Sequence, residues 1–250
     1  MIRREKNGII WLEFELFAEN PHLKHGVFLR HGGQSRGEFS SLNLSYSAGD
    51  QTQDVATNLK RVASILDLPT LISPFQCHGK AIAQVRGGEN PTLLQCDALT
   101  TSCPDIGLLI KHADCQSAII YDPIHHAMAN VHSGWRGSVQ NIYQETIRFM
   151  KRAYGSLPQE LLVGISPSLG PGNAEFIHYR SEFPKDFWQF QVKPCYFDFW
   201  EISRWQLMQC GILPHHIEIA EMCTYSMSQD CFSYRREKRS GRLGTIVALT

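Results

Sequence analysis

Three short runs of apolar residues lie close together in the middle of the chain, at 106–110, 117–121 and 126–131. Runs of this length, bounded by polar and turn residues, are typical of buried β-strands. Asp122 and Pro123 indicate a turn between the second run and the third. Cys115 precedes the second run, and His132 follows the third. We therefore expect both side chains to lie at strand ends, where a rigid backbone directs them to a common point.

Apolar patterns on either side of this segment predict further strands and three helices. The strands are expected at 9–14, as an edge strand, and at 27–30, 81–85, 161–165 and 245–249. Apolar positions three and four residues apart predict helices at 54–66, 138–154 and 202–210. Glycine and proline indicate a loop at 87–91. Because no repeat or linker interrupts the pattern, we expect one domain over residues 1–250, with 1–24 as a peripheral N-terminal segment.

The composition is that of an ordinary globular protein. Of 250 residues, 43% are hydrophobic and 19% are charged, and 24 basic residues balance 24 acidic ones. This balance does not favour a general function at nucleic acids or membrane surfaces. The first residues carry charges without an apolar segment behind them, so we expect no signal peptide and no membrane span. The protein is then most simply cytoplasmic, with its eight cysteines reduced.

Cysteine and histidine residues carry the candidate chemistry. Thiolate and imidazole are ligands that zinc prefers, and a catalytic zinc needs only three protein ligands. His78 follows an apolar segment and precedes a glycine, and it is the candidate third ligand beside Cys115 and His132. In a metal-free alternative, Cys115 is a nucleophile and His132 is its base. Structural histidines are a further alternative, since no local spacing motif joins the three residues.

The loop after His132 predicts an anion-binding site. Gly134, Arg136 and Gly137 lie between the third apolar run and an expected helix. A helix N-terminus presents unpaired N–H groups, and an arginine adds a fork of donors suited to phosphate. The alternative is that the loop only caps the helix. Arg30, which precedes a second glycine-rich loop, is a further candidate contact for phosphate.

Short motifs occur in order along the chain: Arg30-His-Gly-Gly-Gln-Ser, Phe39-Ser-Ser-Leu-Asn-Leu, Gly49-Asp, Gln76-Cys-His-Gly, Asp97-Ala, Ala113-Asp-Cys, His132-Ser-Gly-Trp-Arg-Gly, Cys223-Thr, Phe232-Ser-Tyr-Arg-Arg and Gly241-Arg. In this order they resemble the YfiH family, whose members are also called laccase-domain proteins or multicopper polyphenol oxidases. The resemblance runs from about residue 25 to residue 249. Its most specific parts are the segments around Cys115 and His132.

The resemblance implies a single compact α+β domain of the YfiH type, with mixed β-sheets flanked by helices. It also implies a zinc ion held by His78, Cys115 and His132. The implied chemistry is phosphorolysis of adenosine, inosine, guanosine and S-methyl-5′-thioadenosine, together with deamination of adenosine. The partners would be purine nucleosides and phosphate, bound by a monomer or a small homo-oligomer. The segment 170–175 departs from the family pattern, which leaves the substrate preference open.

Asp114 is the carboxylate nearest to the expected ligands, and it is the candidate catalytic acid or base. Its alternative function is to orient a ligand histidine. Copper is the less favoured metal, because blue-copper oxidases commonly use His-x-His pairs and no two histidines here stand two residues apart. A non-enzymatic zinc-binding module would use the same ligands without turnover.

Overall fold

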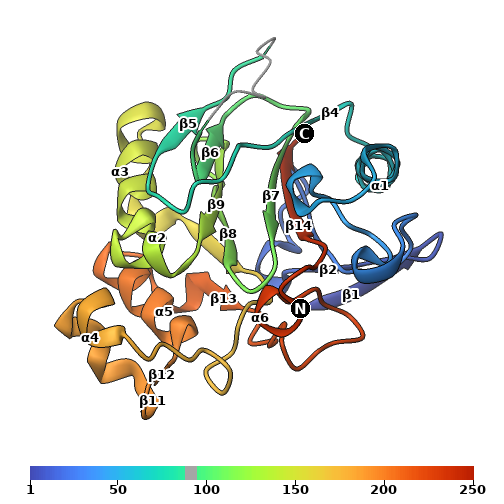
Figure 1. Cartoon of the computed structure of the whole chain (residues 1–250). Helices are drawn as coiled ribbons and strands as arrows, with labels where there is room; N and C mark the ends of the chain where they lie inside the picture. The colour runs from blue at the N-terminus through green and yellow to red at the C-terminus, as the bar shows by residue number, and fades with distance from the viewer. Residues whose placement is uncertain (88–94) are drawn as a thin grey trace.

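Two six-stranded β-sheets pack face to face at the centre of the computed structural model (Figure 1). The structure describes residues 1–87 and 95–250. The first sheet has the strand order β1 (Ile2–Lys6), β2 (Ile9–Glu13), β3 (Leu23–Phe28), β14 (Leu243–Leu249), β7 (Ile106–His112) and β4 (Thr70–Ile72). The second has the order β13 (Ile217–Ile219), β10 (Leu162–Ile165), β8 (Gln116–Asp122), β9 (Ala127–Ser133), β6 (Ala98–Thr101) and β5 (Ile82–Gln84). Both sheets are mixed, since β4 pairs parallel with β7 and β5 pairs parallel with β6.

The central strands are covered on both faces, which explains their uninterrupted apolar runs. Ile119 of β8 belongs to the core between the sheets, whereas the next residue, Ile120, belongs to the core on the outer face of the second sheet. Val247 and Ile246 of β14 divide in the same way about the first sheet. Successive side chains of a strand point to opposite faces, so a strand that is buried on both faces consists mostly of apolar residues.

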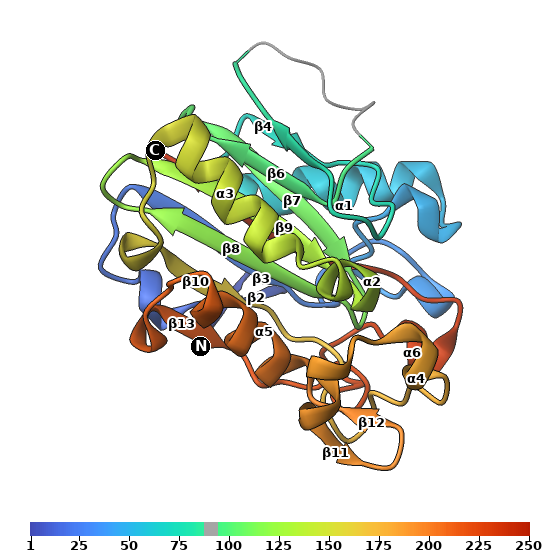
Figure 2. The ribbon, with the colours of Figure 1, turned by 90° about the vertical axis from the view of Figure 1, so that its left-hand side faces the viewer.

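A helical layer covers the outer face of each sheet. Helix α1 (Thr52–Ile65) buries Val62 against the first sheet, and α3 (Ile142–Tyr154) buries Met150 against the second. Figure 2 shows α3 lying along the strands of the second sheet, with α1 on the far side of the molecule. Helix α5 (Phe199–Gln209) packs beside α3. The expected α+β domain, with mixed sheets flanked by helices, is confirmed.

The helix predicted over residues 138–154 is two helices. Helix α2 (Trp135–Val139) ends before Asn141, and α3 begins after it. Asn141 has a left-handed backbone, with φ 53 and ψ 58, and its side chain accepts a hydrogen bond from the N–H of Gln144. Asparagine adopts this conformation more readily than most residues and is a favoured helix N-cap. The prediction of one continuous helix is wrong at this residue.

The N-terminal segment contributes to the core. The strand expected at 9–14 is not at the edge of its sheet, because β1 pairs with its outer side. Phe14 and Phe17 are buried, with exposed fractions of 0% and 1%, in the core between the sheets. Within residues 1–24, β1 is therefore peripheral, whereas apolar side chains that follow it are buried in the core.

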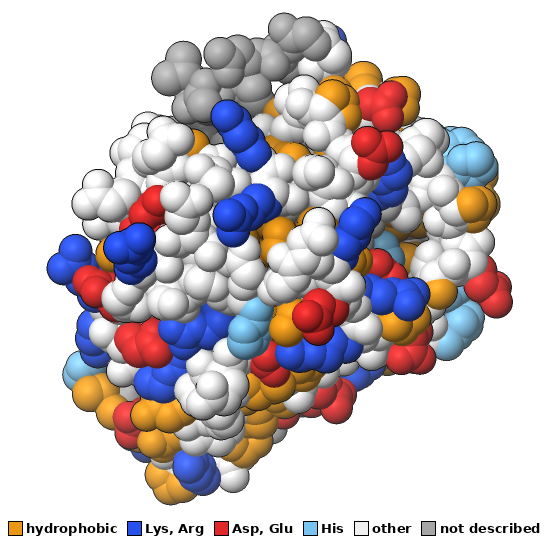
Figure 3. Space-filling model, turned by 90° about the vertical axis from the view of Figure 1, so that its right-hand side faces the viewer, with side chains coloured by type: hydrophobic (Ala, Val, Ile, Leu, Met, Phe, Trp, Pro, Cys, Tyr) orange, Lys and Arg blue, Asp and Glu red, His pale blue; other side chains and the backbone are white. Residues whose placement is uncertain are grey.

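A small aromatic unit lies below the second sheet in Figure 1. It contains α4 (Tyr179–Glu182), β11 (Gln191–Lys193) and β12 (Tyr196–Phe197). Phenylalanine side chains fill its centre. The last short helix, α6 (Tyr234–Glu237), lies where the chain returns toward β14. Basic and acidic side chains intermingle on the face shown in Figure 3.

Two expectations from the sequence concern the remaining parts of the chain. The predicted loop at 87–91 lies outside the described residues, except for Gly87. Within the described part of the chain, the helices are too short or too polar to cross a membrane.

Candidate metal centre

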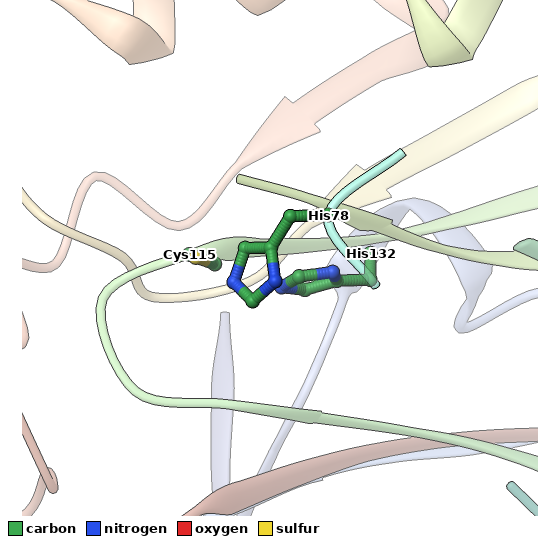
Figure 4. Close-up of side chains that lie close together, drawn as sticks. All are labelled: His78, Cys115 and His132. Carbon is green, nitrogen blue, oxygen red and sulfur yellow. The ribbon is translucent and has the colours of Figure 1, made fainter. Parts of the chain in front are cut away.

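The three candidate metal ligands converge from separate segments (Figure 4). His78 lies in the loop after β4, Cys115 in the turn between β7 and β8, and His132 near the end of β9. One ligand atom from each side chain lies within 4.8 Å of the other two. His78 is exposed, Cys115 is half-buried and His132 is buried. Two nitrogens and one sulfur at this separation suit a zinc ion with an open position toward solvent.

One buried carboxylate holds two of these ligands in place. Asp97 Oδ1 accepts hydrogen bonds from His132 Nδ1 at 2.8 Å and from the N–H of His78 at 2.9 Å. Its Oδ2 accepts from the N–H groups of Cys77 and Gly79, and from the Cys77 thiol. A carboxylate on Nδ1 leaves Nε2 of the imidazole for a metal ion. The sequence reasoning missed this function of Asp97, although Asp97-Ala was among the family motifs.

The charges of the centre support one another. Burial alone would raise the pKa of Asp97, but hydrogen bonds from His132, Gly79 and Cys77 outweigh burial and hold the pKa well below its ordinary value. Burial would likewise raise the pKa of Cys115, yet the neighbouring His132 and His78 lower it to about 6. Burial would lower the pKa of His132, but Cys115 and Asp97 raise it to about 9. The thiolate that results is both the metal-binding and the nucleophilic form of cysteine.

Gly134 leaves the space in which the ligands meet. A Cβ atom at this position would lie 3.0 Å from His78 Cδ2 and 3.1 Å from Cys115 Sγ. Both distances are shorter than an ordinary van der Waals contact, so a side chain here would displace the ligands. The absence of a side chain at Gly134 therefore fits a site in which an ion binds between them.

A cavity of about 430 Å³ opens beside the ligands. This volume is in the range of pockets for small organic molecules. Aromatic side chains form part of its wall: Trp135, Phe176, Phe199 and Tyr234. Cationic side chains form another part: Arg136, Arg235 and Lys238. The cavity therefore offers flat apolar faces and positive charge next to the candidate metal centre.

The residues predicted to bind phosphate are only partly brought together. Gly134 and Arg136 line the cavity, whereas Gly137 and Arg30 do not. Gly137 is buried, where a Cβ would lie 3.3 Å from the carbonyl oxygen of Gly79. The Arg30 guanidinium instead donates to two main-chain carbonyls outside the cavity. The helix that follows this loop is α2, which has only five residues, because the chain breaks at Asn141 before α3 begins.

Asp114 lines the cavity, but both of its carboxylate oxygens are engaged. Oδ1 accepts from the Thr224 hydroxyl at 2.7 Å, and Oδ2 accepts from the N–H of Arg235 at 2.6 Å. Asp97, and not Asp114, is the carboxylate that contacts the ring of His132. The acid or base function of Asp114 stays a prediction. The observed contacts tie the C-terminal segment to the turn that carries Cys115.

A sequence model described as multi-copper polyphenol oxidoreductase laccase matches residues 24–250. The chain belongs to this family. Solved structures that it resembles include YfiH and YlmD proteins. The YfiH protein of Bacillus licheniformis superposes with a TM-score of 0.90 at 25% identity over 99% of both chains. YlmD of Geobacillus stearothermophilus gives a TM-score of 0.89 at 26% identity, over 98% of this chain and 97% of that one. The resemblance to the YfiH family is confirmed, and so is its fold.

Relatives of this chain carry the name purine nucleoside phosphorylase. The protein of that name from Bacteroides thetaiotaomicron is 29% identical over 93% of both chains. Purine nucleoside phosphorylase YfiH of Escherichia coli is 28% identical over 88% of this chain and 91% of its own. These alignments cover the segments that carry the candidate ligands, since they span most of both chains.

Proposed function

We propose that this YfiH-family protein is a metal-dependent purine nucleoside phosphorylase. The observation that supports this most directly is the convergence of His78, Cys115 and His132 at the wall of a cavity that also carries aromatic and cationic side chains. The names of the relatives point to the same reaction. The substrates we propose are adenosine, inosine, guanosine and S-methyl-5′-thioadenosine, with deamination of adenosine as a second activity.

Zinc is the ion that we propose for the three ligands. Two imidazoles and one thiolate match the donors that zinc prefers. A multicopper centre holds several ions and needs more ligands than these three. Across residues 1–87 and 95–250, His78, Cys115 and His132 form the one group of three such side chains whose ligand atoms lie this close together. When bound, the ion supplies Lewis acidity at the cavity wall. Asp97 fixes the orientation of His132 toward it.

Different parts of the cavity wall suit the purine base of the nucleoside and the phosphate. Phe176 and Phe199 are in contact, with ring centroids 5.3 Å apart, and they offer an apolar surface on which a purine can stack. Arg136 lies with its guanidinium 4.3 Å from the centre of the Trp135 ring. Its N–H donors then remain available to phosphate, which a guanidinium binds in a bidentate manner.

A metal-free cysteine hydrolase is the rival function. Cys115, His132 and Asp97 also have the arrangement of a nucleophile, its base and the carboxylate that orients the base. His78 favours the metal-dependent reading, because a nucleophile with its base has no need of a second imidazole at this distance. A non-enzymatic zinc module would keep all three ligands and turn over no nucleoside.

Metal analysis and nucleoside turnover of the wild-type protein distinguish these three proposed functions. We expect about one zinc ion per chain, and release of adenine from adenosine only when phosphate is present. Treatment with EDTA should abolish adenine release, and added zinc should restore it, because the ion is part of the reaction site. Formation of inosine without phosphate reports the second activity. Full activity after complete removal of the metal would instead support the hydrolase reading.

Arg136→Ala is expected to raise the KM for phosphate. Loss of one charge-assisted contact costs about 1.5–3 kcal/mol, which corresponds to roughly 10- to 150-fold. Deamination of adenosine uses water, so its kinetic constants should change much less. Arg136→Lys should recover part of the loss, since an ammonium keeps the charge but not the fork. Arg148→Ala, on the exposed face of α3, is the matched control. Equal losses in both reactions with a lower Tm would show that Arg136 is structural.

A further inference from the structure

Three cationic side chains line the cavity, more than the carboxylates that line it. Arg136, Arg235 and Lys238 line it, and Asp114 is the sole carboxylate among its described lining residues. Both oxygens of Asp114 already accept hydrogen bonds. Within the described ranges, none of the three cations forms an ion pair. Cations that converge on a concave surface raise the local concentration of anions.

Two adjacent arginines in the C-terminal segment make different contacts. Arg236 donates to three main-chain carbonyls and pairs with Glu237, so it holds the segment in place. Arg235 gives one donor to the carbonyl oxygen of Glu175, at 3.0 Å, and its guanidinium lies 5.6 Å from the centre of the Phe176 ring. A guanidinium has five N–H donors. Most of those of Arg235 therefore remain available to a ligand in the cavity.

The backbone keeps Arg235 and Lys238 close to the candidate metal centre. The N–H of Arg235 donates to Asp114, which directly precedes Cys115 in the chain. Lys238 follows α6 with a positive φ of 59 and a ψ of −55, a backbone conformation that residues other than glycine rarely adopt. Strained backbone of this kind tends to occur at ligand sites. An anion held by both cations would lie next to the turn that carries Cys115.

We propose that Arg235 and Lys238 bind a phosphate group of the substrate. The proposal rests on the proposed function and adds to Arg136 a pair of contacts that the sequence did not indicate. The phosphate group has two possible sources, which are inorganic phosphate as co-substrate and the 5′-phosphate of a purine nucleotide. Both present the same tetrahedral anion to a guanidinium and an ammonium.

Equilibrium binding to the purified full-length chain tests the proposal. Isothermal titration calorimetry with inorganic phosphate, adenosine and adenosine 5′-monophosphate compares wild type with Arg235→Gln and Lys238→Gln. We expect each variant to bind at least one phosphate-bearing probe about tenfold more weakly or worse. Adenosine affinity should stay within about twofold. Arg239→Gln is the matched control, because Arg239 pairs with Glu38 at 2.9 Å and does not line the cavity.

The outcomes separate the two sources and the failure of the proposal. Weaker phosphate binding, with the nucleotide bound no more tightly than adenosine, identifies inorganic phosphate as the ligand. A nucleotide that binds more tightly than adenosine, and loses this advantage in Arg235→Gln, identifies the 5′-phosphate. Unchanged binding of both phosphate-bearing probes overturns the proposal, as does an equal loss for adenosine. Arg235→Lys should keep part of the affinity, and thermal unfolding shows whether each variant is folded.

Calorimetry measures binding and does not depend on turnover. The proposed reaction and the proposed phosphate contacts can therefore be refuted independently of each other. A wild-type protein that releases no adenine from adenosine and phosphate refutes the proposed reaction. The calorimetric comparison still decides whether Arg235 and Lys238 bind phosphate groups.

Discussion

Replacing Cys115 with alanine is expected to remove the metal ion from the purified protein and to abolish nucleoside phosphorolysis. The thiolate is one of three donors that lie within 4.8 Å of one another. Loss of a partner outside the ligand set already lowers metal affinity about 10- to 100-fold, so the loss of a ligand itself should be larger. Inductively coupled plasma mass spectrometry gives the metal content, and adenine release gives the activity.

Cys103→Ala is the matched control for this experiment. Cys103 is half-buried, as Cys115 is, and it does not line the cavity. We expect this variant to keep its zinc and its activity. A Cys115→Ala protein with a full complement of zinc would contradict the ligand set. An inactive Cys115→Ala protein, together with wild type that stays active after chelation, would identify Cys115 as a nucleophile.

Asp97→Asn is expected to weaken zinc binding by about 10- to 100-fold while the protein stays folded. Asp97 accepts hydrogen bonds from His132, His78, Cys77 and Gly79. An asparagine of the same shape has one acceptor oxygen, so one side of this arrangement loses its partner. Its neutral amide also no longer stabilises the His132 ring as a carboxylate does. Competition with a chromogenic chelator measures the zinc affinity directly.

The chain offers a second aspartate–histidine pair, with a buried carboxylate and an exposed imidazole, as a control for Asp97. Asp122 has a fully buried side chain and contacts His125 Nδ1 at 2.9 Å, which is close to the 2.8 Å between Asp97 and His132. It also accepts from the N–H groups of Ile124 and His125. Asp122→Asn should therefore lower the Tm and leave zinc affinity unchanged. Equal effects of the two substitutions on zinc affinity would show that Asp97 acts through stability alone.

The central strands were predictable because burial on both faces makes most positions of β7, β8, β9 and β14 apolar. Errors arose where one residue or distant packing decides the structure. Asn141 interrupts an otherwise periodic helical pattern by adopting a left-handed backbone. Phe14 lies between two glutamates in the sequence and Phe17 lies three residues farther on, and residues distant in the chain bury both of them.

The candidate site was accessible from the sequence through its family motifs and not through local spacing. The ligands come from separate segments, and strand pairing brings them together. Asp97 was missed because its partners lie 18 to 35 positions away in the chain. Arg235 and Arg236 are adjacent residues of the same type, so their sequence does not indicate that one lines the cavity and the other holds the backbone. Only the contacts of each guanidinium separate them.

The hydrogen bonds that Asp97 accepts have a consequence for how the protein exists without metal. They hold the loop of His78 and the ring of His132 with protein groups alone. Small zinc domains, by contrast, use the free energy of metal binding to fold. We therefore expect this chain to fold first and to bind the ion afterwards. The fraction of molecules that carry metal would then follow the concentration of free metal ion, whereas the amount of folded protein would not.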